Sequence, residues 1–212
     1  MKQNIVGTMK KIIKSRNFYS GMINAVVVLG ILFIGAYSAS QARAQSIMER
    51  LQIAERQQLE QQIANYEIAE AEYQRQLECL SRNIYFEARS EGALGQRAVA
   101  WVTLNRVQSD RFPDTICEVV HQARRDSAGN PLRHQCQFSW YCDGKSDRIG
   151  NQEKYQEAVR MAELVLARYG VHPDPTEGAT MYHAEYVRPY WINSFERTTQ
   201  IDTHIFYAES GA

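Results

Sequence analysis

The chain has 212 residues, no net formal charge at neutral pH and 44% hydrophobic residues, which is ordinary for a globular protein. Its length allows one domain plus extensions. Because there is no basic excess, the composition gives no support to a nucleic-acid-binding protein. What the protein does must therefore be inferred from how residues are distributed along the chain.

The N-terminal segment has the pattern of an export signal. Residues 1–21 carry five basic residues and no acid, and residues 22–44 contain an apolar run, Met22–Tyr37, followed by Ala42-Arg43-Ala44. A basic region, an apolar region and a small-x-small site predict a secretory signal, cleaved after Ala44. The run is also nearly long enough to be a retained membrane anchor. We favour the anchor, and in both cases we expect residues 1–21 in the cytoplasm and the rest of the chain outside it. A buried helix of a soluble protein is the third alternative.

Residues 45–78 are predicted to form a long helix. No Gly or Pro occurs between residues 45 and 91, and an apolar seam recurs at alternating steps of four and three residues, interrupted once by Glu70. This heptad-like spacing is typical of a coiled coil. It favours a stalk that holds a domain away from the membrane, with a homodimer or a helix folded back on the domain as alternatives. The seam consists of Leu59, Ile63, Tyr66, Tyr73, Leu77 and Leu80.

Residues 79–212 are predicted to form an α+β, mostly helical domain with a small β-sheet. Helices are expected at 94–107 and 152–169, and a short one behind a capping box of Thr115 and Glu118. Gly92 is expected to end the first helix. Residues 123–135 are expected to be a loop, residues 137–141 a short strand or the wall of a cleft, and residues 180–182 and 204–207 strands.

Glu87 is the candidate acid of this domain. It follows Leu80 and Ile84 on one helical face, at positions i, i+4 and i+7, which should point to the core. Burial would raise the pKa of its carboxyl, as a general acid at neutral pH requires. The alternative is a partly exposed glutamate held by Arg82 or Arg89.

Five ordered motifs resemble the SleB/CwlJ-type cell wall hydrolase family. They are Ile84–Arg89, Gly95–Val102, Leu104–Val107, Phe112–Val120 and Gln137–Trp140. The resemblance covers roughly residues 79–207 and implies a lysozyme-like or lytic-transglycosylase-like fold acting on peptidoglycan glycan strands. It also implies that Glu87 is the catalytic acid/base, in lytic transglycosylase chemistry without a metal or an organic cofactor.

A second carboxylate is not obvious in the sequence. Glu91, Asp110, Asp114 and Glu185 are candidates, but none forms a convincing pair with Glu87. A single-acid mechanism fits better. In it the 6-hydroxyl of muramic acid attacks its own anomeric carbon, so that no carboxylate is needed to orient a water molecule.

The substrate groove is expected to be polar and aromatic. Gln137 and Ser139 could hydrogen-bond sugar groups, and His183 follows Tyr182 as a polar pair. Core packing is the alternative for the aromatic residues, and His204 is expected to be structural. The aromatic residues that could stack on sugar faces are Trp140, Tyr182 and Trp191.

The four cysteines all follow the apolar segment. An even number in an exported domain predicts two disulfides, with three pairings open. A zinc site with His121 and His134, or a cysteine nucleophile, is a weaker alternative. The cysteines are Cys79, Cys117, Cys136 and Cys142.

Together these patterns predict an exported enzyme that cleaves the N-acetylmuramic acid–N-acetylglucosamine strand, anchored in the inner membrane or periplasmic. The alternative is a membrane-tethered peptidoglycan-binding scaffold without activity. A peptidase or amidase lacks a convincing constellation of residues. Hydrolysis or transglycosylation, and phage lysis or bacterial wall remodelling, stay open at this point.

Overall fold

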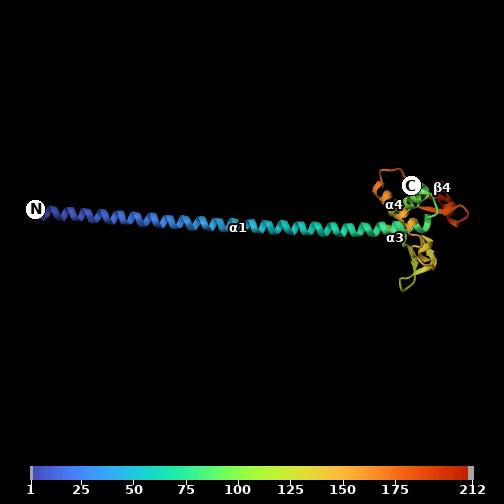
Figure 1. The fold of residues 1–212 in the computed structure, drawn as a ribbon, viewed down its shortest axis with the longest axis horizontal. Helices are drawn as coiled ribbons and strands as arrows, with labels where there is room; N and C mark the ends of the chain where they lie inside the picture. Colours follow the sequence, from blue (N-terminus) through green and yellow to red (C-terminus); the bar gives the residue numbers. More distant parts are fainter. Residues whose placement is uncertain (1, 210–212) are drawn as a thin grey trace. The chain divides into compact units, whose positions relative to one another are not determined.

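The computed structural model describes residues 2–209, with side chains from residue 21 onward. The chain divides into two compact units, residues 1–66 and 67–212, and the first helix runs through the boundary between them (Figure 1). Its elements are α1 (Lys2–Ala88), α2 (Ala93–Val107), α3 (Ile116–Val120), β1 (Ala123–Arg125), β2 (Pro131–Cys136), η1 (Ser139–Cys142), α4 (Gln152–Arg168), β3 (Met181–Ala184), η2 (Tyr190–Ser194), β4 (Glu196–Ile201) and β5 (His204–Ala208).

The first unit is entirely helical over its described residues. It contains a stretch near the N-terminus that is long and apolar enough to cross a membrane, and the side chains of that stretch are exposed. The side chains of the five basic residues lie outside the part that the structure describes. The predicted seam is also exposed here, with Leu59, Ile63 and Tyr66 at 56%, 50% and 70% of their surface. A homodimer through this seam stays a prediction.

The last turns of α1 belong to the core of the second unit. Leu77, Leu80, Ile84 and Ala88 are all buried, as the spacing of the apolar residues predicts. The helix ends at Ala88, so the expectation that Gly92 ends it was wrong.

Gly92 is instead the N-cap of α2, in an extended conformation. Its N–H donates to Oδ2 of Asp202 at 3.1 Å, so the chain turns here against the β4–β5 turn. Asp202 also restricts position 95 to glycine, because a Cβ there would lie 2.6 Å from Oδ2 of Asp202.

The helix α2 is the centre of the second unit. Most of its side chains are buried on every side, as expected of a helix that other elements surround. Trp101 and Leu104 join the larger core cluster with α1, α3 and α4, whereas Ala98 and Val102 join a smaller cluster with Phe206 of the sheet.

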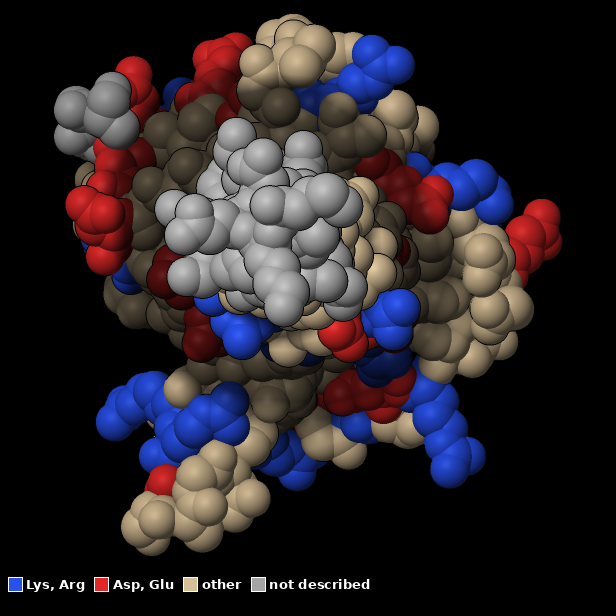
Figure 2. Space-filling view, turned by 90° about the vertical axis from the view of Figure 1, so that its left-hand side faces the viewer, with Lys and Arg blue, Asp and Glu red and all other residues tan. Residues whose placement is uncertain are grey.

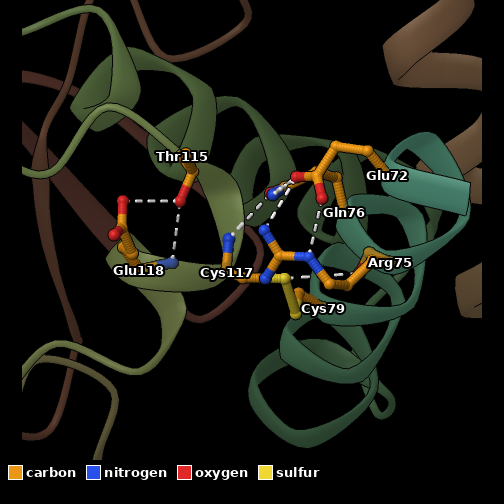
Figure 3. Close-up of polar contacts among 7 residues, drawn as sticks. All are labelled: Glu72, Arg75, Gln76, Cys79, Thr115, Cys117 and Glu118. Carbon is orange, nitrogen blue, oxygen red and sulfur yellow. Dashed lines mark hydrogen bonds and ion pairs between the residues drawn. A yellow bond between two sulfur atoms is a disulfide. The ribbon is translucent and has the colours of Figure 1, made fainter. Parts of the chain in front are cut away.

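The short helix α3 is fastened to α1 by a disulfide and a hydrogen bond (Figure 3). Cys117 forms a disulfide with Cys79, and its N–H donates to Oε1 of Gln76 at 2.9 Å. Thr115 is the N-cap of α3, as predicted, since its hydroxyl accepts from the N–H of Glu118 at 3.3 Å. The carboxylate of Glu118 accepts from the same hydroxyl at 2.7 Å, in place of the backbone N–H that a capping box uses.

Two antiparallel sheets complete the unit. The order β3-β5-β4 places the two predicted strands side by side, with Tyr182 opposite Phe206. The expectation of a loop at 123–135 was wrong, because β1 and β2 form a hairpin that projects below the helices in Figure 1. Gly129, with a φ of +86°, lies in the turn and gives the chain its reversal there.

The remaining predictions for the second unit are largely confirmed. The helix α4 follows the expected range, and the mostly helical α+β class with a small sheet is observed. Residues 139–142 are a 3-10 turn and not a strand, closed by the second disulfide, Cys136–Cys142. On the face shown in Figure 2, acidic and basic side chains are interspersed, in keeping with the net charge of zero.

Candidate active site

A polar cleft of about 570 Å³ opens in the second unit. The end of α1, the helix α2, the η1 turn with the loop after it, and the strands β3 and β5 all contribute to its wall. Residues far apart in sequence thus meet around one space of the size expected for a ligand site. The lining residues are Phe86, Glu87, Arg89, Arg106, Gln137, Ser139, Trp140, Asp143, Lys145, Ser146, Asp147, Tyr182, His183, Ala184, Tyr186, Val187 and His204.

Glu87 lies in the cleft wall with one protein hydrogen bond. The hydroxyl of Tyr182 donates to its Oε2 at 2.9 Å. Neither Arg82 nor Arg89 holds it, since Arg82 donates to the carbonyl of Asp147 and Arg89 lies over the ring of Tyr85. Oε1 of Glu87 accepts no hydrogen bond from the residues that the structure describes, and it is the oxygen available to a ligand.

The surroundings of Glu87 favour its protonated form. Burial raises the pKa of its carboxyl, and the hydrogen bond from Tyr182 and the charge of Arg106 oppose this shift only in part. Burial and the nearby carboxyl also raise the pKa of Tyr182 well above 10, so that its hydroxyl stays a donor. A partly buried acid with a raised pKa is what the sequence predicts for Glu87.

Arg106 of α2 lies in the same wall, and sequence reasoning assigned it no role. It is 3% exposed, packs its guanidinium over Phe138 and Phe112 at 4.7 and 5.3 Å, and donates from Nε to the carbonyl of Thr180 at 2.7 Å. Burial lowers its pKa to about 10, which still leaves it a cation at neutral pH.

The segment Gln137–Trp140 supplies the cleft wall with three of the residues predicted to contact substrate. Gln137 and Ser139 are exposed at its wall. Trp140 is 7% exposed, stacks on Phe86 at 4.6 Å and donates from Nε1 to Oδ1 of Asn83 at 3.0 Å. Trp140 therefore lines the cleft with a ring that is almost entirely buried.

His183 lines the cleft, but both of its ring nitrogens are engaged. Nδ1 lies 2.8 Å from the carbonyl of Ala184 and must donate, so Nε2 accepts from the hydroxyl of Tyr207 at 3.1 Å. Trp191 does not line the cleft; it packs edge-on against His183 and Tyr207.

The free aromatic surface near the cleft belongs to a residue that the sequence did not single out. Tyr186 lines the cleft and is 87% exposed. Tyr190 is 96% exposed and lies outside the cleft lining. Tyr186 differs from the predicted aromatic residues in being exposed. The sequence could not have indicated this, because no residue pattern predicts exposure in an irregular segment.

The carboxylates of the cleft also differ from those considered in the sequence. Of the four candidates, Asp110, Asp114 and Glu185 are exposed and do not line the cleft. Two other aspartates, Asp143 and Asp147, do line it.

The fourth candidate, Glu91, lies beyond the end of α1 and therefore does not continue the face of Glu87. It accepts from the hydroxyl of Thr203 at 2.6 Å and lies 3.9 Å from Nδ1 of His204. Burial lowers the pKa of His204. The imidazole ring of His204 packs edge-on against the ring of Tyr182, so His204 is held in the cleft wall between Tyr182 and Glu91.

Between residues 21 and 209, no group of three or more His, Cys, Asp or Glu side chains is arranged to hold a metal ion. All four cysteines are in disulfides, so the zinc alternative with Cys136 and Cys142 has lost its thiolate ligands.

The fold and the cleft thus define an α+β domain in which burial raises the pKa of a carboxyl at the wall of a polar groove. The chain belongs to the cell wall hydrolase family, whose profile, described as Cell Wall Hydrolase, matches residues 90–207. The match begins just after Glu87 and so does not bear on that residue.

Curated relatives are spore cortex-lytic enzymes. That of Halalkalibacterium halodurans is 31% identical over 61% of this chain and 34% of its own length, and that of Oceanobacillus iheyensis is 42% identical over 63% and 41%. The chain thus spans about a third to two fifths of these relatives.

Among solved structures, the catalytic domain of the Bacillus cereus SleB protein aligns with a TM-score of 0.46 and 27% identity, over 63% of this chain and 90% of that one.

Proposed function

We propose that this protein is an exported enzyme that cleaves the glycan strands of peptidoglycan, with Glu87 as its general acid and base. The observation that carries the proposal is the carboxyl of Glu87 in the wall of the cleft, hydrogen-bonded by Tyr182 and with its pKa raised by burial. Membership of the cell wall hydrolase family and the similarity to spore cortex-lytic enzymes support the same substrate class.

The hydrogen bond from Tyr182 makes the two oxygens of the Glu87 carboxyl different, so each would have its own role in the reaction. Because Oε2 accepts from Tyr182, the proton of the acid belongs on Oε1, which no described residue engages. In the proposed reaction this proton passes to the glycosidic oxygen as the bond to the anomeric carbon breaks. The resulting carboxylate then takes the proton of the muramic acid 6-hydroxyl as that oxygen bonds to the anomeric carbon, giving a 1,6-anhydro product.

Hydrolysis is the second candidate, and one observation favours it. Asp143 and Asp147 line the cleft, and either could activate a water molecule if it faces the opposite side of the sugar ring. The product of hydrolysis is one water heavier than the anhydro product, so mass analysis of the released fragments separates the two reactions.

The test of the function is digestion of purified peptidoglycan by the wild type and by Glu87→Gln. We expect the wild type to release fragments and the variant to be at least ~100-fold slower while still binding the glycan, the usual loss for a general acid. Glu185→Gln is the matched control, because Glu185 is exposed and lies outside the cleft lining. A wild type that binds peptidoglycan without releasing fragments would favour the scaffold alternative, and near-normal digestion by Glu87→Gln would exclude Glu87 as the acid.

We further propose that residues 22–37 hold the enzyme in the inner membrane, that residues 45–78 form a stalk, and that residues 79–212 are the catalytic domain. The apolar, exposed surface of the first unit supports the anchor. N-terminal sequencing of the protein from membrane and periplasmic fractions tests it. An intact Met1 in the membrane fraction is expected, and a single species that begins at Gln45 would mean cleavage.

A further inference from the structure

Arg106 is a buried cation without an ionic partner. Among the residues that the structure describes, no carboxylate oxygen lies within 4.0 Å of its nitrogens. Its Nε and Nη2 contact the carbonyl of Thr180 and Sδ of Met181, and its Nη1 is buried with no hydrogen-bond partner. A buried charge that is only partly satisfied costs stability, so its presence in a cleft wall indicates a task other than folding.

The position of Arg106 indicates what that task is. It lines the same cleft as Glu87 and Tyr182, on α2 between the end of α1 and β3. While Glu87 holds its proton, the site contains a cation and a neutral acid. Once the proton leaves, Glu87 is a carboxylate, and its negative charge offsets the positive charge of Arg106.

We propose that Arg106 is a positioning residue whose guanidinium is the counter-charge for the carboxylate that forms on Glu87 when the acid gives up its proton. The proposal deepens the function proposed above and rests on Glu87 being the acid. A fixed cation stabilises the product of proton loss more than the starting acid, so it lowers the barrier to the proton transfer without holding Glu87 ionised at rest. The absence of a direct ion pair agrees with this balance, because a contact pair would keep the carboxylate ionised before the reaction.

Other charged groups of the cleft must be compared with Arg106. Tyr182 faces the carboxyl directly, whereas the rest of the charged lining lies around the cleft. Burial, the hydrogen bond from Tyr182 and the charge of Arg106 act on the pKa of Glu87, and of these Arg106 supplies the formal charge. The other charged or titratable lining residues are Arg89, Asp143, Lys145, Asp147, His183, Tyr186 and His204.

The experiment measures the pKa of Glu87 directly, by carbon-13 NMR titration of glutamate-labelled full-length protein in detergent. The resonance of Glu87 is assigned by its disappearance in Glu87→Gln. We expect the pKa to rise by about one unit in Arg106→Gln, the scale of effect that removing a nearby opposite charge has. The pH at which activity falls, as the acid loses its proton, should rise by the same amount.

Two further variants keep the inference falsifiable if the glutamine variant does not fold. Arg106→Met is a neutral replacement whose apolar chain suits the space between the rings of Phe112 and Phe138. Arg106→Lys keeps the charge, so the pKa of Glu87 should stay within about half a unit of the wild-type value. If neither neutral variant folds, a rise of about one unit in the lysine variant contradicts the proposal, and an unchanged value supports it.

The matched control is Arg97→Gln, which removes a charge from the same helix. Arg97 points to the carbonyl of Pro173 and does not line the cleft, so the pKa of Glu87 should not change. An unchanged pKa in folded neutral variants of Arg106 would overturn the inference while digestion by the wild type continued. If instead the pKa rises but the wild type does not digest peptidoglycan, the proposed function fails and the electrostatic role stands.

Discussion

The hydroxyl of Tyr182 donates a 2.9 Å hydrogen bond to Oε2 of Glu87, joining the last turn of α1 to β3 across 95 residues of sequence. The bond holds the carboxyl of Glu87 in the wall of the cleft, and among the described residues no other group bonds to its second oxygen. It also sets the direction of several measurable effects.

Replacing Tyr182 by Phe should move the pH dependence of activity. The hydrogen bond stabilises the carboxylate form of Glu87, so its loss raises the pKa of the acid by about one unit, equivalent to a hydrogen bond of ~1.4 kcal/mol to a charged group. Because Glu87 must be protonated to act as the acid, the fall of activity at high pH should shift upward by the same amount. Tyr207→Phe is the control, since its hydroxyl bonds to His183 and not to Glu87. An unshifted profile in Tyr182→Phe would contradict the role of this hydrogen bond.

Glu87→Gln should be more stable than the wild type at high pH. Burial raises the pKa of Glu87 above its ordinary value of 4.5, so the folded state binds its proton more tightly than the unfolded state. The unfolded chain therefore loses this proton first, and the stability of the wild type falls as the pH rises from that value through the raised folded pKa.

The glutamine variant has no proton to lose. Its melting temperature should exceed that of the wild type at about pH 8 and match it at about pH 3.5, where glutamate is protonated in both states. Calorimetry at both pH values checks this, with Glu185→Gln as control. A wild type more stable than Glu87→Gln at high pH would show that the carboxylate is stabilised in the folded protein.

Tyr186→Ala should weaken glycan binding. Its exposed ring is the free aromatic face at the cleft, and the loss of one stacking contact of ~1 kcal/mol should raise KM about fivefold at unchanged kcat. Tyr190→Ala is the matched control, because Tyr190 is equally exposed but does not line the cleft. Equal effects of the two substitutions would argue against a subsite at Tyr186.

The two disulfides should differ in their contribution to stability. Cys79–Cys117 closes a loop with a sequence separation of 38, and Cys136–Cys142 one of 6. Chain entropy predicts that losing the first costs about 4 kcal/mol and losing the second about 2 kcal/mol. Urea denaturation of the two double-serine variants in detergent measures both. The reverse order would mean that the short loop contributes through the native packing and not through the unfolded chain.

Local patterns predicted most of the helical part of this structure. The apolar spacing placed Leu80, Ile84 and Glu87 on one inward face, and Thr115 with Glu118 marked the start of α3, because helix faces and caps depend on residues three or four positions apart. The β1–β2 hairpin was missed since most of its residues are polar and its few apolar residues show no alternation.

The spacing of residues indicated Glu87, and the groove residues expected around it that do line the cleft are Gln137, Ser139, Trp140, Tyr182 and His183. Glu87 stands out as a charge on an apolar face, but its partners Tyr182 and Arg106 come from elements that only the tertiary fold brings together. Arg106 looked like an ordinary charged residue near a helix end, and its burial without a carboxylate could not be read from spacing. Trp191 was expected in the groove, yet its ring faces Tyr207.

The Cys136–Cys142 bridge has a consequence for where the enzyme can work. It closes a small covalent ring that contains Gln137, Ser139 and Trp140, so one wall of the groove is a cyclic peptide. In a reducing cytoplasm this ring is open and the wall loses its covalent closure. We therefore expect a newly synthesised chain to cleave glycan strands poorly until it reaches an oxidising compartment. Formation of this disulfide would then be a maturation step of the proposed enzyme.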